Sequence, residues 1–267
     1  MSKQASPSTP SGALKAPSGA SRASHASGPL ASPQPPRLMF LGDPHGDFRF
    51  AIRCVERYRP LAIVLLGDIQ AQRPLQLELA PILDLTQVWF IHGNHDTDCE
   101  ADHDNLFGSE LAHRNLHGRV AEVAGIRVAG LGGVFRESIW APPLPPAYRS
   151  PAERLKVIRP RERWRGGIPM RHRSSIWPDE VDRLSRQRAE VLVTHEAPGG
   201  LKNGWPALDD LAVAMGAQVL VHGHHHRPID YAGEGRLPRG CRYQAFGVGR
   251  EDFLVWPPAI QSRGSEL

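Results

Sequence analysis

The sequence contains few cysteines and no long apolar run. Its three cysteines, Cys54, Cys99 and Cys241, stand far apart and form no C-x-x-C pair. This spacing excludes a disulfide scaffold and a cysteine zinc finger and is typical of a reducing compartment, so we expect a cytoplasmic protein. No run approaches the roughly 18 apolar residues that cross a bilayer, so we expect no integral membrane protein. With 40% apolar and 22% charged residues among 267, most of the chain can form a buried core.

Acidic residues are absent from the first 36 positions. That stretch contains Lys3, Lys15 and Arg22 and therefore carries a charge of +3. Ser, Ala, Pro and Gly account for 26 of its residues, which leaves too few apolar side chains to offset the entropy of ordering. It also lacks the apolar region of a secretory signal. We therefore predict a disordered tail over 1–36, followed by one domain over 37–267.

A second basic stretch lies inside the predicted domain, at about 136–175. It holds nine arginines and Lys156 against three glutamates, a charge of +7, and it contains seven prolines. The whole chain has a net charge of only +4, so the residues outside the two basic stretches together carry −6. The body of the protein is therefore acidic. We interpret the proline-rich and arginine-rich stretch as an insertion into the domain, because so many prolines argue against a domain of its own.

Short apolar runs alternate with amphipathic ones in the first half of the domain. The runs at 37–41, 61–66 and 88–91 predict buried strands, and the spacing of apolar residues at 48–59 and 74–85 predicts helices between them. Strands that are apolar throughout are typical of a sheet covered on both faces. The alternation of strand and helix therefore predicts an α/β fold.

The second half continues the same pattern after a hairpin. Ala124-Gly125 separates two apolar runs and predicts the turn of that hairpin. Early acidic residues after Trp177 indicate the start of a helix. The remaining expected elements are strands at 119–123, 126–131, 190–194, 218–221, 243–248 and 253–256, and helices at 177–188 and 208–215.

Five of the predicted strands end in a turn that bears Asp, His or Asn. Ligands of open α/β sheets bind beyond the carboxyl ends of the strands, because side chains from separate strands converge there. Mixed oxygen and nitrogen donors suit Mn, Fe, Co, Ni or Zn, and the inventory suffices for two metal ions. The five turns are Gly42-Asp43-Pro44-His45-Gly46, Gly67-Asp68, Gly93-Asn94-His95-Asp96, Thr194-His195 and Gly223-His224-His225-His226.

In this order the five turns resemble the signature of the calcineurin-like metallophosphoesterases. That signature reads GDxHG, GD, GNHD or GNHE, a strand ending in His, and GHxH, and the resemblance covers about 37–256 apart from the basic insertion. The resemblance implies a four-layer α-β-β-α sandwich with a di-metal site at the carboxyl ends of the strands. It implies an enzyme that hydrolyses a phosphomonoester or phosphodiester by attack of a metal-bridging hydroxide.

The resemblance also assigns roles to individual residues. It implies two divalent ions, which could be Mn²⁺, Fe²⁺ or Fe³⁺, Zn²⁺, Co²⁺ or Ni²⁺. The ligands carried over by matched position are Asp43, His45 and His226 for the first ion, Asn94, His195 and His224 for the second, and Asp68 as the bridge. His95 would be catalytic: it would face the substrate and stabilise the phosphoryl oxygens or protonate the leaving group.

One departure from the family concerns the residue that orients His95. In the phosphoprotein phosphatase branch the second motif reads GDxxDRG, and its second Asp has this role. Here Ala71 occupies that position, which argues against a phosphoserine or phosphothreonine protein phosphatase. We therefore place Asp96 with His95 among the catalytic residues, as the one that orients it. The acidic positions from Asp98 to Asp104 are interpreted as a solvated loop.

The basic insertion leaves three interpretations open. It could be a cap that binds substrate phosphate through Arg136, Arg149, Arg161, Arg163 and Arg165. It could equally be a solvated surface loop. Its tryptophans and tyrosine could also stack on bases, as in a nuclease, but the acidic body and the lack of a nucleic-acid motif favour a small phosphate ester. A non-catalytic interaction scaffold is disfavoured because every matched ligand position is occupied. The sequence identifies no protein partner.

Overall fold

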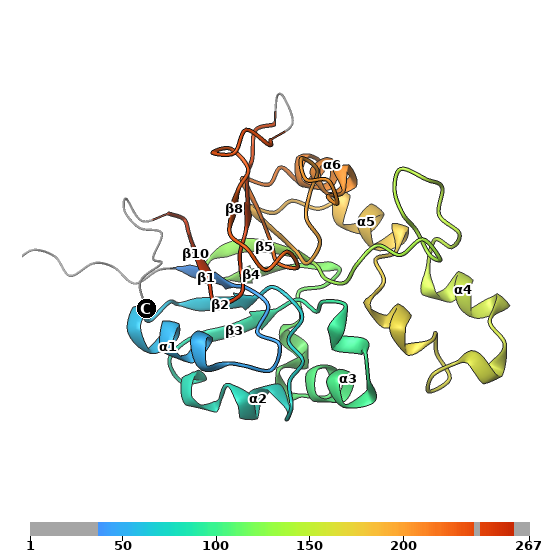
Figure 1. Cartoon of the computed structure of the whole chain (residues 1–267), viewed down its shortest axis with the longest axis horizontal. Coiled ribbons are helices and arrows are strands. Elements are labelled where there is room, and N and C mark those ends of the chain that lie inside the picture. The colour runs from blue at the N-terminus through green and yellow to red at the C-terminus, as the bar shows by residue number, and fades with distance from the viewer. Residues whose placement is uncertain (1–36, 238–240, 259–267) are drawn as a thin grey trace, which may run out of the picture. The chain divides into compact units, whose positions relative to one another are not determined.

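The computed structural model describes residues 37–237 and 241–258 (Figure 1). The predicted tail and the predicted lack of a secretory signal lie outside these residues. Within them, no helix is both long and apolar enough to cross a membrane.

The first sheet has four strands in the order β10-β1-β2-β3. All four strands coincide with apolar runs of the sequence. β1, β2 and β3 run parallel to one another, and β10 pairs with β1 in the antiparallel direction. The parallel strands therefore present their carboxyl ends at the same edge. The bounds are β1 (Leu38–Leu41), β2 (Ala62–Leu65), β3 (Gln87–Phe90) and β10 (Phe253–Trp256).

The second sheet has six strands in the order β4-β5-β6-β7-β9-β8. The predicted hairpin is present as the antiparallel pair β4 and β5, while β5, β6, β7 and β9 run parallel to one another. A short strand that the sequence did not indicate, β8, pairs antiparallel with β9. The bounds are β4 (Arg119–Val123), β5 (Ile126–Leu131), β6 (Val191–Thr194), β7 (Val219–His222), β8 (Ile229–Asp230) and β9 (Gln244–Gly247).

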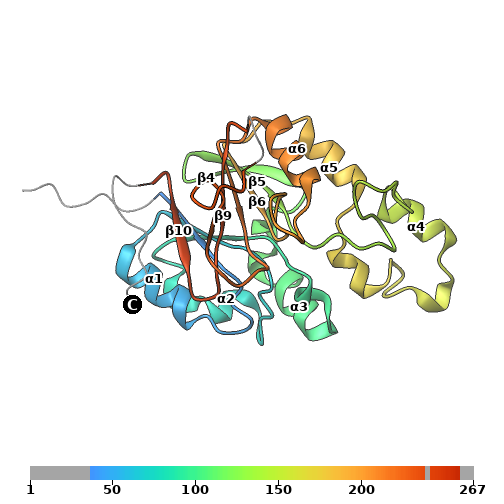
Figure 2. The ribbon, with the colours of Figure 1, turned by 45° about the horizontal axis from the view of Figure 1, so that its top comes forward.

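Alternate residues of each central strand pack on opposite sides of the sheet. In β2, Ile63 and Leu65 pack toward α1 (Arg49–Tyr58), while Ala62 and Val64 pack between the two sheets. Strands of the second sheet likewise divide their side chains between the core that the two sheets share and an outer core. Its outer core includes residues from α5 (Pro178–Ser185) and α6 (Pro206–Met215). Three apolar cores therefore separate four layers, which confirms the predicted α-β-β-α sandwich (Figures 1 and 2).

Two helices differ from the sequence-based expectation. The helix expected over 74–85 is interrupted: α2 covers only Leu75–Glu78, and a 3₁₀ turn, η1 (Ala80–Ile82), follows. Pro81 explains the break, because it lacks an N–H and its ring would clash with a carbonyl of the preceding turn.

The expectation of a loop after Asp98 is wrong. That stretch forms α3 (Glu100–Phe107), whose early acids Glu100 and Asp102 lie at the positive end of the helix.

The basic insertion contains structure of its own. It includes α4 (Pro151–Val157) and two 3₁₀ helices, η4 (Pro160–Glu162) and η5 (Met170–Ser174). A small apolar cluster joins Ile139 and Ile168 of the insertion to Trp177, which follows it. Figures 1 and 2 both show α4 outside the two-sheet sandwich. The segment therefore extends the fold without interrupting either sheet.

Candidate metal centre

The candidate site lies where parallel strands of both sheets end. The loops after β1, β2 and β3 belong to the first sheet, and those after β6 and β7 belong to the second. Two glycines let the loops approach one another. A Cβ on Gly67, whose φ is 105°, would come 2.3 Å from Nδ1 of His195, and one on Gly93 would come 2.2 Å from Oδ1 of Asp68. Only glycine permits this approach, and the loops form one cluster of polar side chains.

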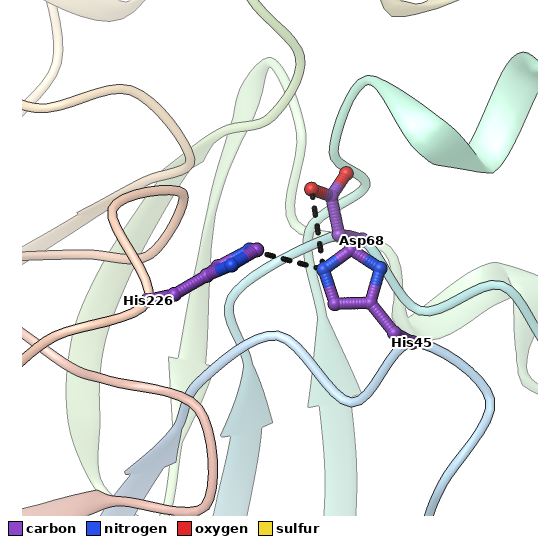
Figure 3. Close-up of side chains that lie close together, drawn as sticks. All are labelled: His45, Asp68 and His226. Atoms are coloured by element: carbon purple, nitrogen blue, oxygen red, sulfur yellow. Dashed lines mark hydrogen bonds and ion pairs between the residues drawn. The ribbon is translucent and has the colours of Figure 1, made fainter.

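Asp68 lies at the centre of the cluster. Its Oδ2 is 3.9 Å from Nε2 of His45 and 3.4 Å from Nε2 of His195. On one side, ligand atoms of His45, Asp68 and His226 lie within 4.8 Å of one another (Figure 3). On the other side, ligand atoms of Asp68, His195 and His224 do the same. Asp68 is therefore shared by two groups that could each hold a metal ion.

The two remaining predicted ligands flank these groups. Oδ1 of Asn94 is 3.3 Å from Nε2 of His195. Asp43 is fully buried, and its Oδ2 accepts the backbone N–H of His224 at 2.8 Å and lies 3.5 Å from Nε2 of His226. Its Oδ1 is buried without a hydrogen-bond partner. A buried carboxylate oxygen needs a hydrogen-bond donor or a cation. Oδ1 of Asp43 is therefore suited to bind a metal ion. The structure brings all seven predicted ligands together.

Two of the histidines are held in the tautomer that metal binding requires. Nδ1 of His45 is 2.6 Å from Oε1 of Gln70, and Nδ1 of His195 is 2.8 Å from the carbonyl oxygen of Leu66. Both oxygens only accept hydrogen bonds, so each Nδ1 donates, and each Nε2 is directed into the cluster. Outer hydrogen bonds of this kind orient the ligands of metal sites. Gln70 has no recognisable signal in the sequence, because its role depends on the fold of the loop after β2.

The charge balance of the cluster also favours a cation. Burial, only partly offset by the charge of His195, raises the pKa of Asp43 to about 7. Burial alone would lower the pKa of His195, but the hydrogen bond and charge of Asp68, with the charge of Asp43, raise it to about 10. The buried carboxylates therefore retain a proton on His195 when no other cation is bound. A divalent ion would take the place of that proton.

His95 lies beside the cluster rather than within it. Its ring centroid is 5.6 Å from that of His45, and its backbone N–H donates to Oδ1 of Asp68 at 2.9 Å. Its Nδ1 is 2.5 Å from Oδ2 of Asp98. Burial opposes the charged form, but the hydrogen bond to Asp98 and the charges of Asp68 and Asp98 raise the pKa of His95. Because the side chain is 44% exposed, the ring faces solvent next to the candidate ligands.

Asp96 points away from His95, and the expectation that it orients this ring is wrong. The buried carboxylate of Asp96 accepts the backbone N–H groups of Gln70 and Gly93, each at 2.8 Å. His95 begins a 3₁₀ helix, η2 (His95–Thr97). Residues three apart share a face of such a helix, and adjacent residues do not. The orienting carboxylate is therefore Asp98, and the spacing of His95 and Asp98 was the sequence signal that could have identified it.

Two of the five candidate substrate arginines are engaged by carboxylates of the chain itself. Arg149 forms an ion pair with Asp182. Arg165 forms ion pairs with Glu100 at 3.0 Å and with Asp104 at 2.6 Å. The two ion pairs of Arg165 connect the basic insertion to α3. These guanidinium groups therefore hold the insertion in place.

The other three candidates have different surroundings. Arg163 donates to the carbonyl oxygen of Leu155 at 3.1 Å, and Arg161 is exposed on η4. Arg136 is half-buried and donates to Oγ of Ser174 at 3.2 Å. That hydroxyl also contacts η2, the helix that begins with the predicted catalytic histidine. Of the five arginines, Arg136 is thus the one that the hydrogen bonds link to the metal-ligand loops.

Comparisons with known proteins agree with the fold. A family model described as calcineurin-like phosphoesterase matches residues 36–228. An uncharacterised protein of Haemophilus influenzae is 42% identical over 195 residues, which cover 73% of this chain and 85% of that protein. The crystal structure of the protein TT1561 of Thermus thermophilus superimposes with a TM-score of 0.51 and 14% identity, over 82% of this chain and 91% of that one. At this identity the structural match shows the fold alone.

Proposed function

Because this chain belongs to the calcineurin-like phosphoesterase family, we propose that it is a metal-dependent hydrolase of a small phosphate ester. The observation that carries the proposal is the position of Asp68, which is shared between two groups of candidate metal ligands. A carboxylate in that position can bridge two ions. The mixed imidazole, carboxylate and amide donors favour Mn²⁺, iron, Zn²⁺, Co²⁺ or Ni²⁺ over Ca²⁺ and Mg²⁺.

The seven ligands divide between two ions. Bound there, two divalent ions would polarise the phosphoryl group and supply a nucleophile from water at neutral pH. The buried strands hold the ligands in place, and Gln70 keeps the His45 ring in its ligating orientation. One ion would be held by Asp43, His45 and His226, and the other by Asn94, His195 and His224. Asp68 would be a ligand of both ions.

His95 supplies the proton in this proposal. Its Nδ1 is held by Asp98, so the opposite nitrogen of the ring is free to face a substrate. The raised pKa of His95 favours the protonated form of the ring. A protonated imidazole at this place can donate to a phosphoryl oxygen or protonate the oxygen of the leaving group.

The surroundings of the aromatic residues favour a small substrate over nucleic acid. Trp164 packs against His103 at 4.6 Å between ring centroids, and its ring lies 4.4 Å from the guanidinium of Arg165. Tyr148 lies under Arg154. Because these rings already pack against side chains of the chain, they are poorly placed to stack on bases.

The free cysteines support a cytoplasmic location.

Hydrolysis assays test the proposal. The full chain, supplied with Mn²⁺, is expected to hydrolyse p-nitrophenyl phosphate or bis-p-nitrophenyl phosphate. Asp68→Asn should lower kcat/KM by at least about a hundredfold because it weakens the shared ligand. Asp84→Asn, which changes an exposed aspartate of the described chain, is the matched control. A folded, metal-loaded wild type that is inactive on both substrates would exclude the proposed function.

A further inference from the structure

The buried imidazole of His172 contacts one arginine of the basic insertion, Arg171, and the charges of two others, Arg136 and Arg154, act on it. Nε of Arg171 donates to Nε2 of His172 at 3.2 Å, and Nδ1 of His172 contacts Oγ of Ser175 at 3.0 Å. Burial and the charges of Arg171, Arg136 and Arg154 lower the pKa of His172 to about 4. The imidazole is therefore neutral at physiological pH. Three positive charges act on it, in a segment where Arg149 and Arg165 have carboxylate partners.

Two of these guanidinium groups have a buried donor without an acceptor, and the third, that of Arg171, is exposed. Nε of Arg136 and Nε of Arg154 are buried and have no hydrogen-bond acceptor. Arg154 uses one other nitrogen on the hydroxyl of Tyr148, at 2.9 Å, and Arg136 uses one on Ser174. Within 37–237 and 241–258, no carboxylate forms an ion pair with Arg136, Arg154 or Arg171. Buried donors without acceptors, together with unbalanced positive charge, indicate a site for an external anion.

The arginine cluster lies on the His95 side of the candidate metal centre. Oγ of Ser174, which accepts from Arg136, is 2.7 Å from Oγ1 of Thr97 and 3.5 Å from the carbonyl oxygen of Asn94. The η5 helix packs against η2. The charges of Asp98 and Glu196 act on Arg136, although neither forms an ion pair with it. Since Asp98 holds His95, an anion bound by Arg136 would lie near the group that protonates the leaving oxygen.

We infer that Arg136, Arg154 and Arg171 bind a second phosphate of the substrate, carried by the leaving group. The inference rests on the proposed function and narrows it to organic diphosphates and bisphosphates. In the reaction, water oxygen bonds to the scissile phosphorus and the bond to the leaving oxygen breaks. That oxygen takes a proton, and the product keeps its own phosphate on the arginines. Planar guanidinium groups suit this role because they bind phosphate oxygens in pairs.

The first test measures binding without turnover. The full chain is titrated with inorganic phosphate by calorimetry in the presence of a chelator, so that the metal centre does not contribute. Wild type should bind, and Arg136→Gln and Arg171→Gln should each raise Kd by about tenfold, the loss expected for one charge-assisted contact. Arg159→Gln removes the same charge from an exposed position of the insertion and should match wild type. Unchanged binding in the folded Arg171→Gln variant, or no binding by wild type, overturns the inference.

The second test concerns the leaving group. Propyl phosphate and 1,3-propanediol bisphosphate differ only in a second phosphate on the leaving group. With Mn²⁺, wild type should show at least tenfold higher kcat/KM for the bisphosphate, and Arg136→Gln and Arg171→Gln should reduce this ratio. Equal rates overturn the inference, as does no turnover of either by a chain that hydrolyses p-nitrophenyl phosphate. If phosphate binds through the arginines but no ester of any kind is hydrolysed, the proposed function fails while the anion site stands.

Discussion

The imidazole of His95 and the carboxylate of Asp98 are joined across one turn of a 3₁₀ helix, with Nδ1 and Oδ2 2.5 Å apart. Removing the charge while keeping the shape tests this pair. Asp98→Asn should lower kcat on p-nitrophenyl phosphate by about tenfold, less than the roughly 10²- to 10⁴-fold that loss of the acid–base group itself costs, with little change in KM.

The same substitution should alter the pH dependence. The pKa of His95 is raised by Asp98, so the protonated form persists to higher pH than for an ordinary histidine. Asp98→Asn removes a charge that favours the protonated ring, and the alkaline limb of the kcat profile should move to lower pH. A pH–rate profile of wild type, Asp98→Asn and the control Asp84→Asn measures this. An alkaline limb that stays in place would show that Asp98 does not set the protonation of His95.

Gln70 should affect metal binding rather than chemistry. It accepts the hydrogen bond from Nδ1 of His45, so Gln70→Leu leaves that ring free to rotate. Loss of an outer partner typically weakens metal affinity by about 10- to 100-fold. Titration with Mn²⁺ should show reduced activity at limiting metal that excess metal restores. Gln218→Leu, at an exposed position, is the control, and equal Mn²⁺ affinity in both variants would contradict the role of Gln70.

Metal binding should stabilise the fold. The buried Oδ1 of Asp43 has no hydrogen-bond partner, and a cation would satisfy it. At a metal concentration of about 100 times Kd, the expected gain in unfolding free energy is about 2.7 kcal/mol. Thermal denaturation with Mn²⁺ and with chelator should therefore give a higher Tm with metal. Asp68→Asn should reduce this difference and Asp84→Asn should not; a Tm unaffected by Mn²⁺ in wild type would argue against the site.

The ion pairs of Arg165 should control the mobility of the insertion more than global stability. Arg165 pairs with Glu100 and Asp104 on α3, and such solvent-exposed pairs add little to the free energy of unfolding. Arg165→Gln should thus leave Tm nearly unchanged but raise hydrogen exchange in the amides around η4. Arg163→Gln, which removes no ion pair, serves for comparison. Equal exchange in the two variants would show that these pairs do not fasten the insertion.

The strands and the seven candidate metal ligands could be predicted because their signals are local. Each apolar run that ends in Gly with Asp or His is a continuous stretch of sequence, and burial on both faces of β2 requires every residue of Ala62–Leu65 to be apolar. The loop predicted after Asp98 failed because its acids were interpreted as solvated. Those acids instead favour the first turn of α3.

The arginines could not be sorted from the sequence because their partners are distant along the chain. Arg165 meets Glu100, which is 65 positions away, whereas Arg171 has a neutral histidine as its neighbour. Nine arginines of the same charge look alike in the sequence. Only the fold determines which of them meet carboxylates and which retain free donors. Arg154 and Arg171 were therefore absent from the predicted substrate residues.

The ligands of the candidate centre come from both sheets, with His45 and Asp68 on loops of the first and His195 and His226 on loops of the second. The site consequently exists only after the two sheets have docked face to face, and either sheet alone would carry an incomplete set. A bound ion would act as a cross-link between the two halves of the sandwich. During refolding, the return of activity would then report the moment at which the halves join, separately from the formation of their strands.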